Sequence, residues 1–479
     1  MIVLALLLVC ALGIALVGAL WKVQLRFSAQ IVLTVSLGIG TGLGTSSCLY
    51  FLLLMTGAGR WTVIGVEAGL VVAAAAFAWF GKGREWPAED RTDNPGIAIL
   101  GPFLLAFAMA AGAFALLAGI NREGFWDAWS IWNLHARFLF RGGPDFWRNA
   151  FSPHIPWAHP DYPLLLSGTI ALCWTIAGAE SALGPQLIAG LFGLASLGVI
   201  TGAIAILRGR VQALLAGTLL LGTFFFVQTA ASQYADVPVS FYVLATLALF
   251  ALQDRSPSDL RFTALAGAMA GFTAWTKNEG LLFVAVVLIA RAVALFRYRG
   301  ARELLRQIPA ALVGALPVLA VVAIFKFRYA PANDLMSQVT PGHILHNVID
   351  LGRYLTMLEA LVLQLFDLGQ FVVPVVLVLG LYAWLVRFKI GEPMRLTAAT
   401  LVLALGLMLA GDFGVYILFS YDLNFQLINS LHRLLLQLWP AAILTFFALT
   451  ATPVLRAPPG SKKTAAARTA PAQGRKSKK

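Results

Sequence analysis

Acidic and basic side chains lie in the short polar stretches between long apolar runs, and five of them have types that could act on a substrate. Asp127 lies in an aromatic stretch, Asp236 opens an apolar run, Lys277 and Glu279 are two residues apart, and Arg433 precedes the last apolar run. A carboxylate can remove a proton from an attacking hydroxyl. A guanidinium or ammonium can hold a phosphate through charge-assisted hydrogen bonds. Together, these types suit acid–base chemistry beside an anionic leaving group.

The stretch around Asp127 predicts an amphipathic helix. Polar residues recur on one helical face and tryptophans lie largely opposite, which is typical of a helix in a membrane interface. A carboxylate among interfacial tryptophans is costly unless it is hydrated, paired or used in chemistry. We therefore expect Asp127 to be catalytic. The structural alternative is a charge on the wet face, paired with Arg122 or Arg137.

Asp236 and Glu279 each stand where an apolar helix is expected to begin. We expect Asp236 to be a second catalytic acid and Glu279 to contact a substrate. The structural alternatives are an N-cap at Asp236, for a helix that starts at Val237, and a favourable interaction of Glu279 with the N-terminus of its own helix.

A second polar cluster, His159-Pro160-Asp161-Tyr162-Pro163, precedes another apolar stretch. We expect His159, Asp161 and Tyr162 to bind a substrate. The alternative is a helix start, in which Asp161 caps the helix and Pro163 occupies the first turn.

Three cations are candidates for holding a phosphate: Lys277, Arg353 and Arg433. Lys277 could instead extend along the apolar surface to the interface. Arg433 stands at the mouth of the last apolar run, where a guanidinium can hold a phosphate bidentately. Its neighbours Asp422 and His432 are further candidates for substrate contact.

The elements that must position these residues are apolar. The chain is 59% hydrophobic and 12% charged, and such a composition over 479 residues indicates an all-α, polytopic integral membrane protein. About thirteen segments could cross the bilayer: 2–20, 31–55, 61–80, 97–120, 185–207, 211–231, 237–252, 262–276, 280–296, 308–327, 371–387, 396–411 and 434–451.

The net charge of +13 does not indicate nucleic-acid binding, because Lys and Arg form short clusters between the apolar runs rather than one basic face. Cys10, Cys48 and Cys173 lie inside apolar segments without disulfide or metal spacing, so we interpret them as packing residues. No His and Asp spacing specifies a metal site. Asp127 and Asp236 stay candidates for a divalent ion, and no other cofactor is indicated.

The distribution of basic residues predicts the topology. Residues 1–20 lack a basic segment before them, so they are expected to form a retained helix with the N-terminus outside. Most of the 35 Lys and Arg residues fall on one side, the cytoplasmic side, only if the apolar stretches 162–178 and 343–366 do not cross. Both are then interfacial or re-entrant on the outer side, and the candidate acids and Arg433 share that side.

The expected organisation has four parts. Residues 1–96 form extra N-terminal transmembrane helices, and 97–296 form a catalytic module with external loops at 121–161, 232–237 and 277–280. Residues 297–454 form a C-terminal transmembrane module with an external interfacial helix at 343–366. The basic residues 455–479 are expected to be a disordered cytoplasmic tail.

With these residues identified, the chain resembles the GT-C superfamily of polyprenyl-phosphate-sugar glycosyltransferases, notably protein O-mannosyltransferases and lipid A aminoarabinose transferases. The first external loop with Asp127, the cluster His159-Pro160-Asp161 and the acid Asp236 look similar to that family over about 97–296. A late segment, 421–440, also looks similar. The chain carries a lone Asp127 where mannosyltransferases carry adjacent acids, and Asp161 where they carry a second proline, so the acceptor class stays open.

The resemblance implies an inverting transfer of a sugar from a polyprenyl phosphate, such as undecaprenyl phosphate, on the periplasmic face of a bacterial inner membrane. Asp127 would deprotonate the acceptor, while Arg433 and Lys277 would stabilise the phosphate, with Arg353 as a third cation. Asp236 would orient the region of Asp127 or help to bind a divalent metal. The expected partners are the lipid-linked donor, a glycan, lipid or protein acceptor of the cell envelope, and the bilayer.

Two other functions stay open. An O-antigen ligase or polymerase also takes lipid-linked sugars but usually has its functional residues in a large late external loop. A secondary transporter should have charges buried within helices and broken helices in paired halves. Glu67 is the main such charge, and no paired halves are evident.

Overall fold

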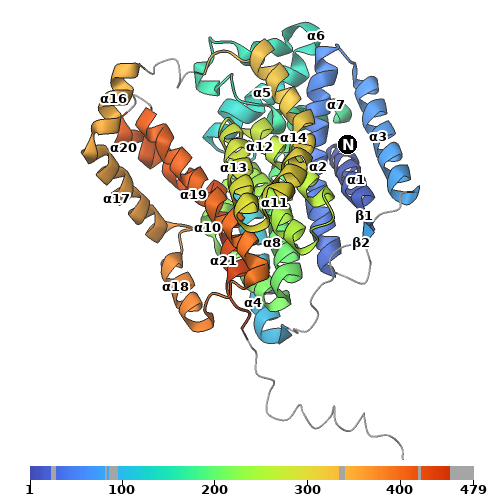
Figure 1. Ribbon diagram of the computed structural model, residues 1–479. Coiled ribbons are helices and arrows are strands. Elements are labelled where there is room, and N and C mark those ends of the chain that lie inside the picture. Colours follow the sequence, from blue (N-terminus) through green and yellow to red (C-terminus); the bar gives the residue numbers. More distant parts are fainter. Residues whose placement is uncertain (23–27, 81–83, 86–94, 334–339, 419–421, 454–479) are drawn as a thin grey trace, which may run out of the picture.

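The computed structural model describes residues 1–22, 28–80, 84–85, 95–333, 340–418 and 422–453. The tail predicted at 455–479 lies outside these residues. The described chain is almost entirely helical, and its two strands, β1 (Trp21–Lys22) and β2 (Arg84–Glu85), form a short parallel pair. Figure 1 shows the helices gathered into one upright bundle.

Ten helices in the described chain are long and apolar enough to span a membrane. Eight are single uninterrupted helices: α1 (Ile2–Leu20), α2 (Ser28–Met55), α3 (Arg60–Phe80), α4 (Gly96–Ile120), α8 (Leu183–Arg208), α11 (Asp236–Arg255), α13 (Glu279–Arg299) and α14 (Ala301–Arg328). Two combine an α-helix with short segments before it: η4 (Glu392–Met394) with α19 (Arg395–Leu418), and α20 (Leu423–Gln426) and η5 (Leu427–Leu431) with α21 (His432–Leu449).

The expected thirteen spans therefore become ten long helices, and the other three segments are shorter or broken helices. The segment 211–231 consists of α9 (Arg210–Gly222) and α10 (Phe224–Ala231), which are bent by 61° at Thr223 and count as one further span only if taken together. The segment 262–276 is the 16-residue helix α12 (Arg261–Thr276). The segment 371–387 is the 12-residue helix α18 (Val375–Val386).

The polar contacts at one end of the bundle, here called the basic end, involve mainly arginines. Arg208 donates to the carbonyl oxygens of Ala448 and Lys389, and Arg255 donates to that of Leu207. Segments that the charge pattern places on one side therefore meet at one end.

The opposite end, here called the site end, holds the candidate acids. The helix α7 (Leu165–Ala177) begins and ends there. At its start, the carbonyl oxygen of Leu164 accepts a hydrogen bond from Ser47, and near its end, that of Ile176 accepts one from Arg60. Because Ser47 and Arg60 both lie toward the site end of the bundle, the stretch 162–178 returns to the end from which it starts, as the charge pattern predicts.

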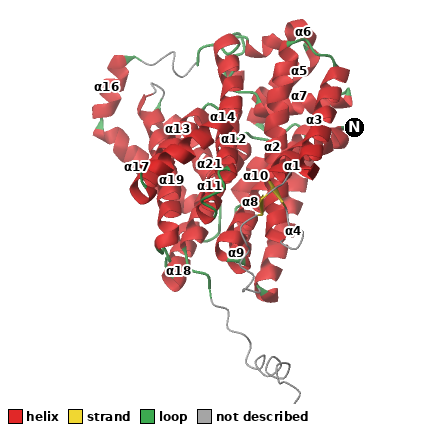
Figure 2. Cartoon of the chain, turned by 45° about the vertical axis from the view of Figure 1, so that its right-hand side comes forward, coloured by secondary structure: helices red, strands yellow, loops and turns green. Residues whose placement is uncertain are grey.

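The stretch 343–366 forms two helices rather than the single helix expected. It forms α16 (Pro341–Ile349) and α17 (Leu351–Asp367), and Arg353 at the start of α17 donates to the carbonyl oxygen of Tyr416 near the site end of α19. Both views show α17 running obliquely beside the bundle from α16 toward α18 (Figure 1, Figure 2).

Close contacts of small residues hold the N-terminal helices together. A Cβ added to Gly42 on α2 would lie 2.2 Å from the carbonyl oxygen of Val9 on α1, and one added to Gly13 would lie 1.9 Å from that of Gly38. Such close approach of backbones is how helices associate in a membrane, where lipid gives no hydrophobic driving force. One buried apolar cluster includes residues from all three expected transmembrane parts.

Candidate functional site

Asp127 stands directly before a widened helical turn. The π-helix η1 (Ala128–Trp132) follows it and continues into α5 (Asn133–Arg141). The loop is held in place by hydrogen bonds from Asn133 to the carbonyl oxygen of Glu123 and to the side chain of Gln233, both 3.2 Å long. Single π turns are rare and occur frequently at functional sites.

Arg433, on the other side of the site, also lies close to a π turn. The π-helix η5 (Leu427–Leu431) ends immediately before His432, where α21 begins, so Arg433 is the second residue after a π turn. Asp127 and Arg433, which form the central ion pair of the site, thus each lie next to a π turn.

A network of ions joins three helices and the first loop. Arg433 donates to Asp236 Oδ2 through Nε, at 3.0 Å, and through Nη2, at 2.7 Å, and Nη2 also donates to Asp127 Oδ2. Gln437 donates to Asp236 Oδ1 at 2.7 Å. The Lys277 ammonium lies 3.3 Å from Asp236 Oδ1 and 3.1 Å from Glu279 Oε1. Since residues far apart in the sequence meet here, only the fold creates this arrangement.

The carboxylates in this network keep Lys277 charged. Burial alone would lower the pKa of Lys277, but the carboxylates of Asp236 and Glu279 outweigh burial and raise this pKa above its usual value. Lys277 is therefore a fixed cation. The ring of Tyr234 also stabilises the charge of Arg433 through a cation–π contact, because the guanidinium lies 4.7 Å from the ring centroid.

A cavity of about 160 Å³ opens beside this network. It has an ionic side, described above, and an aromatic side. Its lining residues are Trp126, Asp127, Ile131, His159, Tyr162, Asp236, Lys277, Glu279, Ser430, Arg433, Leu434 and Gln437. Seven of the residues singled out in the sequence thus share one cavity: Asp127, His159, Tyr162, Asp236, Lys277, Glu279 and Arg433.

Aromatic rings form a column at one wall of this cavity. His159 stacks on Tyr162 with 4.8 Å between centroids and 14° between planes, and Tyr162 stacks on the buried Trp132 at 5.7 Å and 18°. His159 has a φ of +45°, in the left-handed region that non-glycine residues rarely adopt. Backbone strain of this kind gathers at ligand-binding sites.

Asp161 lies next to the cavity but belongs to a different network. Its Oδ2 accepts hydrogen bonds from Asn278 at 2.7 Å and from Asn333 at 2.8 Å, and Lys326 lies 3.5 Å away. Asp161 is 2% exposed, and its Oδ2 is engaged by these neighbours. It anchors the first loop to the site ends of α13 and α14, and it does not line the cavity.

Three other predicted site residues lie elsewhere. Arg353 reaches the backbone of α19 at Tyr416. Asp422 is exposed and caps α20 by accepting a hydrogen bond from the Phe425 backbone nitrogen at 2.8 Å. His432 turns away from Arg433 to pack against Phe225, with 5.3 Å between ring centroids, and lines a separate cavity.

The structure adds Gln437, Ser430 and Asp412 to the candidates. Gln437 follows Arg433 by four residues on α21, so the helical period could have identified it. Ser430 lines the cavity and its hydroxyl lies 2.7 Å from that of Tyr416. Asp412 is 3% exposed within α19, one residue past the expected end of the apolar segment 396–411, and no hydrogen bond to it exists within the described chain.

A divalent ion shared by Asp127 and Asp236 would have to replace Arg433, because the guanidinium stands between the two carboxylates. Among the described residues, no three His, Cys, Asp or Glu side chains are grouped in a way that could hold a metal ion.

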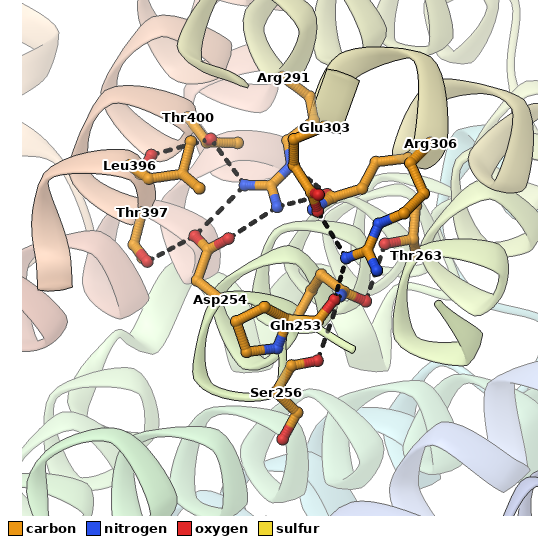
Figure 3. A network of polar contacts seen from close by, with 12 residues as sticks. Gln253, Asp254, Ser256, Thr263, Arg291, Glu303, Arg306, Leu396, Thr397 and Thr400 are labelled. Atoms are coloured by element: carbon orange, nitrogen blue, oxygen red, sulfur yellow. Dashed lines mark hydrogen bonds and ion pairs between the residues drawn. The ribbon is translucent and has the colours of Figure 1, made fainter. Parts of the chain in front are cut away.

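A second buried network lies at the basic end and links helices that carry site residues at their opposite ends (Figure 3). Arg291 on α13 is fully buried, and its guanidinium donates to both oxygens of Asp254 on α11, at 2.7 and 3.3 Å, to Gln307 on α14 and to Thr400 on α19. Because every nitrogen of this guanidinium has a partner, the cluster has no capacity for a ligand. It ties together the helices that carry Asp236 and Glu279 at their other ends.

Comparison of the chain with protein-family models, with curated proteins and with solved structures finds no match. Any function assigned to the chain therefore rests on its own residues.

Proposed function

We propose that the chain is an inverting membrane glycosyltransferase that takes its sugar from a polyprenyl-phosphate-linked donor. The observation that carries the proposal is the juxtaposition of Asp127 with Arg433 in a small cavity at one end of an apolar helical bundle. A base and a cation for an anionic leaving group are the two functions that such a transfer needs. A donor dissolved in the membrane reaches such a cavity from the bilayer.

In the proposed reaction, Asp127 accepts the proton of an acceptor hydroxyl. The hydroxyl oxygen forms a bond to the anomeric carbon, the bond from that carbon to the phosphate oxygen breaks, and its electron pair leaves with the polyprenyl phosphate. Arg433 and Lys277 stabilise the negative charge that develops on this phosphate. Attack opposite the leaving group inverts the anomeric configuration.

In this proposal, donor binding activates Asp127 as the base by changing the partner of Arg433. Asp236 is fully buried and accepts from Arg433, Lys277 and Gln437, whereas the Asp127 carboxylate is 14% exposed and has Arg433 as its sole hydrogen-bond partner among the described residues. An incoming phosphate therefore competes with Asp127, not with Asp236, for the guanidinium. A carboxylate released from a cation is the stronger base, so donor binding would activate Asp127.

The donor experiment uses purified protein in detergent or nanodiscs, with a polyprenyl-phosphate sugar and, separately, a nucleotide sugar. Release of polyprenyl phosphate from the first, and no turnover of the second as sole donor, is the expected result. Turnover of a nucleotide sugar without lipid would overturn the proposal. A lipid comparison of a deletion strain with its parent would then identify the natural sugar and acceptor.

We further propose that the site end faces the periplasm across a bacterial inner membrane, with the N-terminus outside and the C-terminus in the cytoplasm. Support comes from the arginines gathered at the basic end. Ser152 lies on the first loop at the site end, and the exposed Ser258 lies at the basic end. A membrane-impermeant thiol reagent added to intact spheroplasts should label Ser152→Cys and not Ser258→Cys. The reverse labelling pattern would place the site in the cytoplasm.

A further inference from the structure

The polar groups of the cavity divide into two sets. On the ionic side, Asp127, Asp236, Lys277 and Arg433 are all paired with one another. Two further polar groups have no hydrogen-bond partner within the described chain: the Tyr162 hydroxyl and the buried Glu279 Oε2, whose sister oxygen Oε1 pairs with Lys277. A buried carboxylate oxygen without a partner costs free energy unless a ligand or water completes it.

These two groups lie beside the aromatic column of His159, Tyr162 and Trp132. Burial first, and the negative charge of Glu279 second, raise the pKa of Tyr162 above its usual value. Tyr162 is therefore a neutral phenol that can donate a hydrogen bond, next to a carboxylate that accepts hydrogen bonds. The column offers an apolar ring face at the same wall.

The loop holds His159 in its strained conformation by local bonds. The His159 nitrogen donates to the carbonyl oxygen of Pro156 at 3.1 Å, and the Tyr162 nitrogen donates to that of His159 at 2.9 Å. Asp161, fixed by its own network, secures the turn between the two rings. A left-handed backbone is costly for a residue other than glycine, and the fold here maintains it while the ring lines the cavity.

We propose that His159, Tyr162 and Glu279 form the subsite for the donor's sugar ring, which rests on the function proposed above. A monosaccharide combines a C–H face, which packs on an aromatic ring, with hydroxyl groups at its edge. The hydroxyls donate to Glu279 and accept from Tyr162. The phosphate lies at Arg433, which pairs with Asp127 and Asp236, because the Glu279 carboxylate beside Lys277 repels it.

The size and the charge of the cavity both fit this assignment. Its volume of about 160 Å³ is below the roughly 300–1,000 Å³ of pockets for drug-sized ligands, so it suits one ring rather than an oligosaccharide. Trp126, which is 58% exposed at the same cavity, leaves the wall open to solvent or membrane. The acceptor would enter past this residue, toward Asp127.

The test measures binding of detergent-solubilised protein to four lipids: decaprenyl phosphate alone, and decaprenyl phosphate that carries arabinose, mannose or glucose. The wild type should bind at least one of the glycosylated lipids more tightly than the bare lipid. Tyr162→Phe keeps the stacked ring and should weaken that preference by roughly 2- to 10-fold, as the loss of one hydrogen bond predicts. His159→Asn tolerates the left-handed backbone but removes the ring, and it should also reduce the preference.

Glu279→Gln should reduce the preference most, because it replaces a charged acceptor. The affinity for bare decaprenyl phosphate should stay unchanged in Tyr162→Phe and His159→Asn, and should stay unchanged or rise in Glu279→Gln, which removes a negative charge. The matched control is Glu123→Gln. The Glu123 carboxylate lies on the first external loop, pairs with Arg137 and is 51% exposed. It should behave as the wild type in every assay.

Three outcomes would overturn the subsite. The first is a wild type that does not distinguish glycosylated from bare lipid, the second is variants that keep its preference, and the third is variants that lose affinity for both lipids equally. In each case the lipid still binds and the donor proposal survives. Failure of the wild type to bind any of the four lipids would overturn the donor proposal together with the subsite.

Discussion

Arg433 and Asp236 form a two-point contact across 197 residues of sequence, in which Nε and Nη2 of the guanidinium both donate to Oδ2 of the carboxylate, at 3.0 and 2.7 Å. Asp236 is fully buried, so this pair is the fixed part of the site. Asp127, which meets the same guanidinium from the first loop, is the exchangeable part. The predictions below separate these two roles and then test the helices that hold them.

Asp127→Asn should lower turnover by roughly 10²–10⁴-fold, because an amide keeps the size of the side chain but cannot accept a proton at neutral pH. Affinity for decaprenyl phosphate should be retained or should rise, since the phosphate no longer competes with a carboxylate for Arg433. Single-turnover kinetics and lipid binding on the same sample measure both effects. Glu180→Gln, at a loop carboxylate paired with Arg141, is the control. Near-normal turnover of Asp127→Asn would move the base to another acid.

Arg433→Met should destabilise the protein by about 3–5 kcal/mol, because it leaves the buried Asp236 carboxylate without its main partner. Arg433→Met combined with Asp236→Asn should recover much of that stability but none of the turnover. Thermal unfolding in detergent, followed by intrinsic fluorescence, reports the first effect, and an activity assay reports the second. If the double variant unfolds as readily as Arg433→Met alone, the two residues are not energetically coupled.

Arg291→Met should also destabilise the protein by about 3–5 kcal/mol, because it leaves the buried Asp254 carboxylate at the basic end without its ion-pair partner. Protein that stays folded should keep most of its turnover, since Arg291 does not reach the cavity. Arg395→Gln provides the comparison. Its pair with Glu392 is exposed, so its loss should change stability by less than about 1 kcal/mol. Equal effects of the two substitutions on the unfolding temperature would contradict the structural role assigned to Arg291.

Gly42→Val should separate α1 from α2, because its Cβ would lie 2.2 Å from the Val9 carbonyl oxygen. We expect a loss of roughly 1–3 kcal/mol or more from overpacking, seen as a lower unfolding temperature and reduced yield of monodisperse protein. Gly65→Ala on α3 tests the opposite case, since a Cβ there meets nothing within 4 Å. That variant should be neutral or slightly stabilised.

His135 should make stability depend on pH. Burial first, and the charge of His159 second, lower its pKa while Asp161 raises it, and the net result is a decrease from the usual 6.5 to about 4. Between these two pH values the unfolded chain binds more protons than the folded one, so stability falls as pH decreases from about 6.5 to 4 and then levels off. The total effect is about 3 kcal/mol.

His135→Phe removes the titrating ring and keeps a planar side chain against Phe151. The gap in unfolding temperature between this variant and the wild type should shift in favour of the variant as the pH is lowered from 7 to 4. A gap that stays constant over this range would show that His135 does not titrate there.

Much of the fold follows from local sequence patterns. Hydropathy identifies the apolar helices, and each of the thirteen expected segments contains at least one helix, because backbone groups in a membrane must be satisfied within each helix. The clustering of arginines likewise predicts that α7 returns to the end from which it starts. Length is less reliable: nothing in the composition of 211–231 indicates the 61° bend at Thr223.

The sequence by itself also determined which residue types could act: Asp127, Asp236, Lys277, Glu279 and Arg433 stand out because charges are costly beside apolar segments. Only the tertiary structure decided their partners. Asp127 and Arg433 meet across 306 residues, and pairings over such distances depend on helix packing, which no local pattern encodes.

The same packing assigns the neighbouring candidates to other tasks. Asp161 accepts hydrogen bonds from Asn278 and Asn333, and Arg353 donates to the backbone carbonyl oxygen of Tyr416 on α19. A charged side chain at a helix end binds whichever partner the fold brings within about 3 Å, because a buried polar group left unpaired is costly. Residue type therefore restricts what a side chain can do, and the position of its neighbours decides what it does.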